Sequence, residues 1–333
     1  REDGVNVYTS VLTSVYTDAK WKDVEGEAFI FFDGTTNNPV PLLTTFDYNY
    51  ISSGVQIMGL VLMSVAIFIA LVSGTWVVVY RKERIVRAAQ PEFLYILCAG
   101  AAIMASSLAF ISFDEEKGWS EEELSKACQA FPWFFVMGYL LIYCALFSKL
   151  WRINKLLSLR RQKVQIHHAL WPFAIMLSLS LIVLIVWQVV NPLTWIRSVV
   201  EGTSLETRGE CSTEDGSTPY IIVLGCLMGI TTLMTSYIAW KTKDVQSELS
   251  ESSWIFYGIF SHIQIWIIGI PTYIILDGES ADASHIIATA LVFVFSTVMV
   301  VLVIWPKIFS WVSERFFGGR FNKKQQRSTI NVS

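Results

Sequence analysis

The sequence predicts an all-α membrane protein, a seven-transmembrane helix bundle preceded by a short extracellular β-like segment at the N-terminus. Three observations lead to this fold class. Only 16% of the 333 residues are charged, against roughly 25% in soluble domains. The mean hydropathy is +0.48. The apolar residues also gather in runs of about 20, the length that crosses a hydrocarbon core of roughly 30 Å.

Seven such runs are present, and each is expected to be a helix, because a span surrounded by lipid must satisfy its own backbone hydrogen bonds. The runs are Val55–Tyr80, Phe93–Phe113, Cys128–Leu150, Ala169–Val190, Tyr220–Trp240, Trp254–Leu276 and His285–Trp305. A β-barrel would need alternating segments of about ten residues. These runs are longer and uniformly apolar, so the helical bundle is preferred.

Lysine and arginine are distributed unequally between the two sets of connecting segments. Seventeen lie after the first, third, fifth and seventh runs, and seven lie in the N-terminal segment and the other loops. Cytoplasmic loops carry the excess of Lys and Arg in multi-pass proteins. The bias predicts an extracellular N-terminus and a cytoplasmic C-terminus, and an odd number of spans agrees with termini on opposite sides.

Three regions are expected along the chain. Residues 1–50 are expected to be an extracellular stalk together with the last strands of a domain that lies mostly upstream. "VNVYTSVLTSVY" and "EAFIFFDGTTNNPVPL" have the composition and turn signals of strands. The alternative is a short disordered tail. Residues 51–309 are expected to be the seven-helix domain. Residues 310–333 are expected to be a basic cytoplasmic tail, which either lies on anionic membrane lipids or is a disordered, solvated tail.

The five cysteines divide into two groups. Cys98, Cys144 and Cys226 lie within the apolar runs, where a thiol packs as a small apolar group. Cys128 and Cys211 lie on the predicted outer side, where disulfides form and persist. We expect a bridge between them that ties the third span to the loop between the fourth and fifth. The alternative is two free thiols.

The sequence lacks the groups that most enzymes and ion-coupled transporters use. No run has an Asp or Glu near its middle, whereas proton and ion transport usually requires such groups. The four histidines are not at metal-ligand spacing. No phosphate loop, nucleophile elbow or catalytic carboxylate pair is present. We expect no enzymatic activity, cofactor, metal ion or nucleic-acid partner, and the pattern favours a signal-transducing receptor.

Five short motifs occur in order along the bundle. They are "QPEFLYILCAGA", "ACQAFPWFFVMGYLLIYCALFSKLWRI", "WQVVNPL", "WKTKDV" and "WPKIF". With these motifs the chain resembles the transmembrane half of class C G-protein-coupled receptors, most closely the GABA-B type. The chain lacks the cysteine-rich linker of several class C branches, which favours the GABA-B-like branch.

The resemblance implies a function. It implies a plasma-membrane receptor that acts as a homo- or heterodimer, with a bilobed extracellular domain that binds a small amino-acid-like ligand. Closure of that domain would reorient two bundles, which would then activate a heterotrimeric G protein. The resemblance also implies the bridge between Cys128 and Cys211.

Lys149 lies just inside the edge of the third span, where an unpaired ammonium is costly. Glu248 and Glu251, just before the sixth span, are the nearest candidate partners. Glu251 is closer to the span, and the resembling receptors place an acidic residue there. We expect an ion pair between Lys149 and Glu251 that holds the third and sixth spans together in the resting state. The alternative is a lysine whose stem extends to the interface with no fixed partner.

The basic inner loops are the expected contact surface for the G protein. The residues expected there are Arg84, Arg87, Arg152, Lys155, Arg160, Arg161, Lys163, Lys243 and Lys307. The alternative is that these charges only set the topology of the chain.

Two other functions remain open from the sequence. One is a seven-span transporter or channel, against which the carboxylate-free spans argue. The other is a receptor-like subunit that only couples to the G protein, or only binds the ligand, and relies on a related partner for the rest.

Overall fold

A computed structural model of the chain describes residues 14–17, 20–23, 48–158, 167–199, 206–213, 216–242, 251–276 and 280–330. Side chains are described for residues 48–155, 171, 173–199, 206–213, 216–242, 253–275 and 280–315. The chain divides into two compact units, Arg1–Phe46 and Asp47–Ser333.

The described part of the first unit is a small antiparallel hairpin. Strand β1 (Ser14–Thr17) pairs with β2 (Lys20–Asp23), with Ser14 opposite Asp23. Strand β1 overlaps the end of the strand expected within residues 5–16. The strand expected within residues 27–42 lies outside the described residues.

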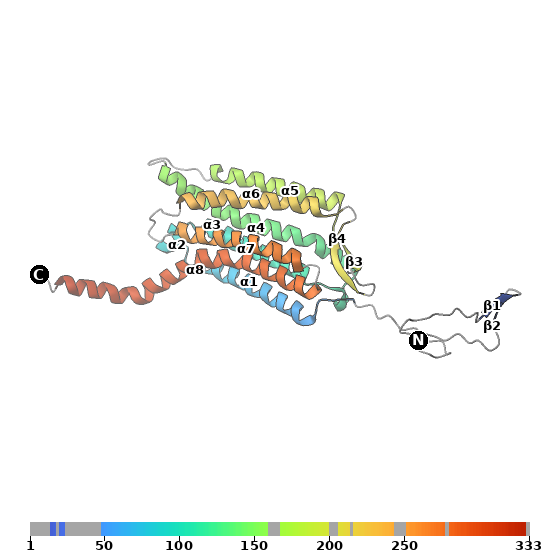
Figure 1. The fold of residues 1–333 in the computed structure, drawn as a ribbon. Coiled ribbons are helices and arrows are strands. Elements are labelled where there is room, and N and C mark those ends of the chain that lie inside the picture. Colours follow the sequence, from blue (N-terminus) through green and yellow to red (C-terminus); the bar gives the residue numbers. More distant parts are fainter. Residues whose placement is uncertain are drawn as a thin grey trace, which may run out of the picture. The chain divides into compact units, whose positions relative to one another are not determined.

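The second unit is a bundle of long helices that run side by side (Figure 1). Within its described residues, seven helices are long and apolar enough to cross a membrane. They are α1 (Ser53–Val79), α3 (Pro91–Ile111), α4 (Glu121–Ser158), α5 (His167–Val190), α6 (Thr218–Thr242), α7 (Glu251–Leu276) and α8 (Ala281–Ile330). A short helix, α2 (Arg84–Ala88), and a 3₁₀ turn, η1 (Glu115–Lys117), lie in two of the connections. The predicted multi-pass membrane protein with seven helical spans is confirmed.

Helix α4 begins earlier than the apolar run that predicts it, because polar residues cap its start. The Ser120 hydroxyl oxygen accepts a hydrogen bond from the Glu123 amide at 3.4 Å, and the Glu123 carboxylate accepts one from the Ser120 amide at 3.0 Å. This reciprocal pattern is a capping box. It starts the helix in the acidic segment before Cys128, ahead of the apolar run.

A second hairpin closes one end of the bundle and was not expected from the sequence. Strand β3 (Thr194–Val199) pairs antiparallel with β4 (Thr207–Ser212) at the end where α1 begins (Figure 1). We refer to this as the hairpin end. The opposite end carries α2 (Figure 1), and we refer to it as the basic end because the basic residues within 149–155 lie in the last turns of α4 and Lys307 lies past the middle of α8.

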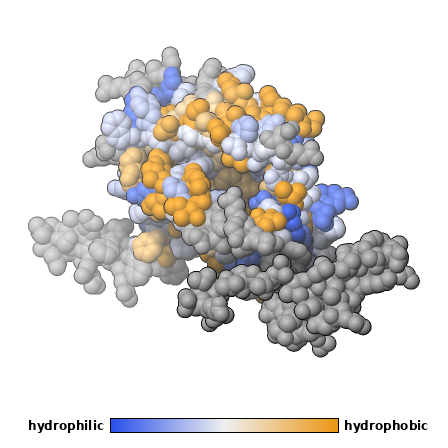
Figure 2. Space-filling model, turned by 45° about the vertical axis from the view of Figure 1, so that its right-hand side comes forward, coloured by the Kyte–Doolittle hydropathy of each residue, from blue (hydrophilic) through white to orange (hydrophobic). Residues whose placement is uncertain are grey.

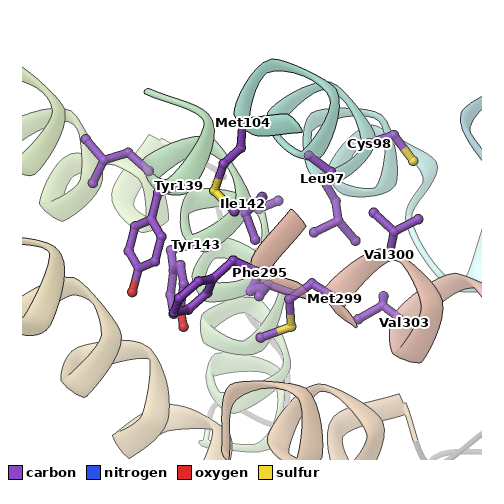
Figure 3. Packing of buried hydrophobic residues seen from close by; sticks show 14 of the residues in the cluster. Leu97, Cys98, Met104, Tyr139, Ile142, Tyr143, Phe295, Met299, Val300 and Val303 are labelled. Atoms are coloured by element: carbon purple, nitrogen blue, oxygen red, sulfur yellow. The ribbon is translucent and has the colours of Figure 1, made fainter. Parts of the chain in front are cut away.

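The core lies where α3, α4 and α8 meet (Figure 3). Met104 from α3, Ile142 and Tyr143 from α4, and Met299 from α8 are at most 1% exposed and point toward one another. Helices α3 and α4 approach closely because Gly138 has no side chain. A Cβ at Gly138 would lie 2.5 Å from the Met104 nitrogen and 2.7 Å from the Gly100 oxygen.

The flanks of the bundle expose large apolar side chains (Figure 2). Phe68 on α1, Val189 on α5, Leu233 on α6 and Ile275 on α7 are all at least 66% exposed. A contiguous apolar flank of this kind is unfavourable in water and favourable against lipid chains. The exposed apolar sides of these helices therefore face the hydrocarbon core of the membrane.

Candidate functional site

A disulfide fixes the β3–β4 hairpin to the bundle. It joins Cys128 on α4 to Cys211 on β4, with a Cα–Cα distance of 5.6 Å. The Trp195 amide, opposite Cys211 in the hairpin, also donates to the Ser125 hydroxyl on α4 at 3.0 Å. The hairpin is thus attached to α4 through both of its strands.

The Glu115 carboxylate attaches β3 to the connection between α3 and α4. One oxygen accepts a hydrogen bond from the Trp195 indole, and the other accepts one from the Arg197 guanidinium at 2.7 Å. Residues two apart on a strand share a face, which is why one carboxylate reaches both. Gly209 on β4 makes room for the indole, because a Cβ there would clash with the Trp195 ring.

The chain just before α1 crosses this end of the bundle, and we call residues 48–52 the lead-in segment. The Ile51 amide donates to Asp114 and the Ser52 amide donates to Asp282 on α8, both at 2.7 Å. The Ser53 hydroxyl accepts a hydrogen bond from the Lys117 ammonium, also at 2.7 Å. The segment is therefore attached to η1 and α8 before the first span begins.

Asp114 is a buried carboxylate, only 4% exposed, at the edge of this site. Burial raises its pKa above the ordinary value, and the hydrogen bonds from the amides of Ile51 and Glu115 act in the opposite direction. Because both oxygens accept from backbone amides at 2.7 Å, the carboxylate holds the lead-in segment against the end of α3.

Beneath these contacts lies a cavity of about 510 Å³. The lead-in segment and the hairpin line one side of it, through Asn49, Tyr50, Ile51, Arg197 and residues 208–211. Most of the remaining lining is apolar and includes Phe135, Val136, Met228 and Trp266. The volume falls within the range of small-molecule sites. The lining suits a ligand with an apolar body and a polar group near the two guanidinium groups of Arg197 and Arg208.

Below the cavity, aromatic side chains connect α4, α7 and α8. Tyr139 on α4 lies edge-on to Trp266 on α7 and to Phe295 on α8, with ring centroids 6.2 Å apart in both cases. The Tyr143 hydroxyl lies 3.1 Å from Nδ1 of the fully buried His262 on α7. Polar contacts in a dry interior fix one helix arrangement. Displacement of a side chain in the cavity wall therefore affects α4 and α7 together.

At the basic end, the structure buries two of the lysines singled out above. Lys149 on α4 is 2% exposed and Lys307 on α8 is 4% exposed. The Lys307 ammonium donates to the Val303 carbonyl, one turn earlier on the same helix, at 2.9 Å. Glu251 is the first residue of α7, and its side chain lies outside the described residues.

Four of the remaining basic residues are placed at or near the surface of the basic end. Arg84 and Arg87 are exposed on α2, whose opposite face buries Ile85 and Val86. Arg152 and Lys155 are half-buried on α4, and the Lys155 ammonium lies 5.6 Å from the centre of the Trp151 ring. Four residues lie outside the described residues, namely Arg160, Arg161, Lys163 and Lys243.

These observations together define a class of protein. Seven spans, a hairpin joined by a disulfide to the third span, a cavity beneath it and basic residues at the opposite end are features of a seven-helix receptor. The family model described as "7 transmembrane sweet-taste receptor of 3 GCPR" matches residues 50–307. The chain therefore belongs to the class C G-protein-coupled receptor family, whose members are receptors rather than enzymes.

Individual relatives agree with this assignment. The chain is 23% identical over 299 residues to gamma-aminobutyric acid type B receptor subunit 2 of Caenorhabditis elegans, covering 86% of this chain and 35% of that protein. It is 22% identical over 305 residues to the human subunit 2, covering 85% and 31%. It is 27% identical over 209 residues to metabotropic glutamate receptor-like protein J of Dictyostelium discoideum, covering 61% and 25%.

The chain spans about a third or less of the length of these curated relatives. The relatives support the GABA-B-like branch expected from the sequence, and the family does not favour the transporter or channel alternative. The ligands and partners of these full-length relatives are therefore not assigned to this chain by the similarity alone.

Proposed function

We propose that this chain is the signal-transmitting membrane domain of a GABA-B-like receptor. A domain preceding residue 51 binds a small amino-acid-like ligand, and the bundle passes the resulting movement to a heterotrimeric G protein. In this proposal residues 1–50 are the stalk with the last strands of that domain, residues 51–309 are the bundle, and residues 310–333 are a basic tail. The receptor acts as a dimer with itself or with a related subunit.

The observation that carries the proposal is the position of α4. At the hairpin end, Cys128 on α4 is bonded to the hairpin, which in turn contacts the lead-in segment through Arg197. At the basic end, the same helix carries the buried Lys149 and the half-buried Arg152 and Lys155. A single continuous helix thus joins the segment nearest to the preceding domain to the end where the basic residues gather.

The proposed orientation places the hairpin end outside the cell and the basic end in the cytoplasm. It is supported by the excess of Lys and Arg in the segments that lie at the basic end. The disulfide at the hairpin end is also compatible with an oxidising exterior. The receptor is accordingly a multi-pass protein of the plasma membrane with its N-terminus outside.

The resting state is proposed to depend on an ion pair between Lys149 and Glu251. The burial of Lys149 supports this, because an ammonium removed from water requires compensation. Glu251 begins α7, the helix that also carries His262 and Trp266, both in contact with residues of α4. The pair would hold the basic ends of α4 and α7 together.

The G protein is proposed to bind the basic end. Arg84, Arg87, Arg152 and Lys155 are the described residues that support this surface, and Arg160, Arg161, Lys163, Lys243 and Lys307 complete the proposed set. Lys307 would require a conformational change to reach a partner, since it is buried here.

Nucleotide exchange on a purified G protein tests the proposal. The 333-residue chain in lipid discs is expected to raise the exchange rate above that of empty discs. Replacing Arg84 and Arg87 by Gln is expected to reduce this rate, because both are exposed and neither belongs to the core. Replacing Lys126 by Gln at the hairpin end removes a similar exposed charge, whose ion pair with Glu122 lies on the helix surface, and should leave the rate unchanged. Exchange equal to that of empty discs would contradict the coupling.

A flux assay separates the proposal from the transporter or channel alternative. The chain reconstituted in liposomes is expected to produce no ion or solute flux above that of protein-free liposomes. A flux that the chain alone produces would favour the alternative.

A further inference from the structure

The cavity at the hairpin end has a cover made of two parts that are held very differently. The hairpin is bonded covalently to α4 through Cys128 and Cys211. The lead-in segment is held by hydrogen bonds and aromatic contacts. Both parts line the cavity, the first with residues 208–211 and the second with residues 49–51. The lead-in segment is therefore the part of the cover that can move without breaking a covalent bond.

Arg197 connects these two parts. Its guanidinium donates to the Tyr48 carbonyl at 3.0 Å and lies 5.0 Å from the centre of the Tyr48 ring and 4.8 Å from that of Tyr50. Its Nε donates to the Glu115 carboxylate at 2.7 Å. One side chain of β3 thus holds the lead-in segment from below and is itself oriented by a carboxylate.

The backbone turn at Asn49 explains why both tyrosines reach the same guanidinium. Asn49 has φ 42°, in the left-handed region that Asn tolerates better than most residues. The turn leaves the rings of Tyr48 and Tyr50 stacked, with centroids 5.5 Å apart and an interplanar angle of 11°. The pair presents a double aromatic surface to Arg197, while Asn49 and Tyr50 line the cavity.

We propose that the lead-in segment is a gate over the cavity and that Arg197 is its latch. The segment covers the cavity while Tyr48 and Tyr50 are in contact with Arg197. It admits polar molecules from water when the two tyrosines move away from Arg197. The remaining attachments allow such a movement. Ile51, Ser52 and Ser53 are held at the start of α1, so the segment can swing about this point. Any pull on the chain before Tyr48 acts directly on the latch.

The gate is tested by the rate at which a thiol inside the cavity reacts with a water-soluble reagent. Ala288 on α8 lines the cavity, and Ala288→Cys places a small thiol there. The background replaces Cys98, Cys144 and Cys226 by Ser or Ala and keeps the disulfide. A charged, membrane-impermeant methanethiosulfonate is added to the whole chain in lipid discs, and the labelling rate is followed by mass spectrometry.

Arg197→Gln is expected to raise the labelling rate of Ala288→Cys about tenfold, a change that corresponds to about 1.4 kcal/mol in the closed-to-open equilibrium. Tyr50→Ala is expected to raise it in the same direction, since it removes half of the aromatic surface. Glu115→Gln is expected to have a smaller effect, because it removes the group that orients the latch.

Arg208→Gln is the matched control. Arg208 also lines the cavity, but its guanidinium donates to Ser284 on α8 at 3.2 Å. The substitution removes the same charge from the same wall, so it corrects for the electrostatic effect on a charged reagent. A second control places the thiol at Glu122, which is exposed outside the cavity. Labelling of Glu122→Cys should be equally fast in every background, which shows that the reagent is equally active toward each variant, and an unchanged Tm shows that each variant is folded.

Three results would overturn the gate. One is a labelling rate of Ala288→Cys that Arg197→Gln leaves unchanged while Glu122→Cys labels normally. Another is an equal acceleration by Arg208→Gln. The third is fast labelling by a lipid-soluble maleimide in every background together with no labelling by the polar reagent, which would mean access from the lipid. The readout does not involve a G protein, so it is independent of the proposed function.

Discussion

Removing the disulfide between Cys128 and Cys211 is expected to destabilise the bundle strongly. The bridge closes a loop with a sequence separation of 83 residues. In the chain-entropy model, a loop of this length is worth about 4.5 kcal/mol. At roughly 2 °C per kcal/mol for a chain of this size, Cys128→Ser together with Cys211→Ser should lower the Tm by about 9 °C. The loss should be the same under reducing conditions in the unmodified protein.

The assay is thermal unfolding in detergent, followed by size-exclusion chromatography after heating. Cys226→Ser is the matched control, because Cys226 is an exposed free cysteine of α6. It makes the same chemical change without opening a loop, so its Tm should equal that of the unmodified chain. A double variant that melts together with this control would refute the reasoning, because the bridge would then contribute nothing to the folded bundle.

Two further predictions concern packing and pH. Gly138→Ala should lower the Tm by a few degrees, because its Cβ would meet the backbone of α3 and overpacking costs about 1–3 kcal/mol. Gly229→Ala is the control and should not lower the Tm, because its Cβ would meet nothing within 4 Å. Equal effects of the two substitutions would contradict the close approach of α3 and α4. Burial raises the pKa of Asp114, so the folded state binds this proton more tightly than the unfolded state. The cost of the buried charge is present above the raised pKa and is relieved as the pH falls through it. The Tm of the unmodified chain relative to Asp114→Asn should therefore rise as the pH falls from neutral toward the ordinary pKa of an aspartate, about 4; a fall would mean that the pKa is depressed instead.

The spans were predictable from the sequence because each is a long apolar run. The expected run Phe93–Phe113 and the observed helix α3 (Pro91–Ile111) differ by two residues at each end. The start of α4 was misplaced because a capping box, and not hydropathy, determines it. The bridge between Cys128 and Cys211, expected from their position on one side of the membrane, is present in the structure.

The β3–β4 hairpin was missed because its strands are only six residues long and carry no fully buried residue, so they lack the apolar alternation of a core strand. Trp195, Ile196 and Val199 favour a strand, and "NP" at 191–192 ends the preceding helix, so a signal was present. The cavity and its contacts could not be predicted, because Glu115, Arg197 and Tyr48 are far apart in the sequence. Only the folded bundle brings them together.

The most direct test of the account is a double-mutant cycle on basal nucleotide exchange, with the chain in lipid discs and a purified heterotrimeric G protein. The account predicts that Lys149→Glu and Glu251→Lys each raise the basal rate. If the pair contributes about 1.4 kcal/mol to the resting state, each rise is about tenfold. The double exchange restores the opposite charges and should return the rate to that of the unmodified chain. Two rises that simply add in the double variant would show that Lys149 and Glu251 do not form a pair, and no exchange in any variant would contradict the coupling itself.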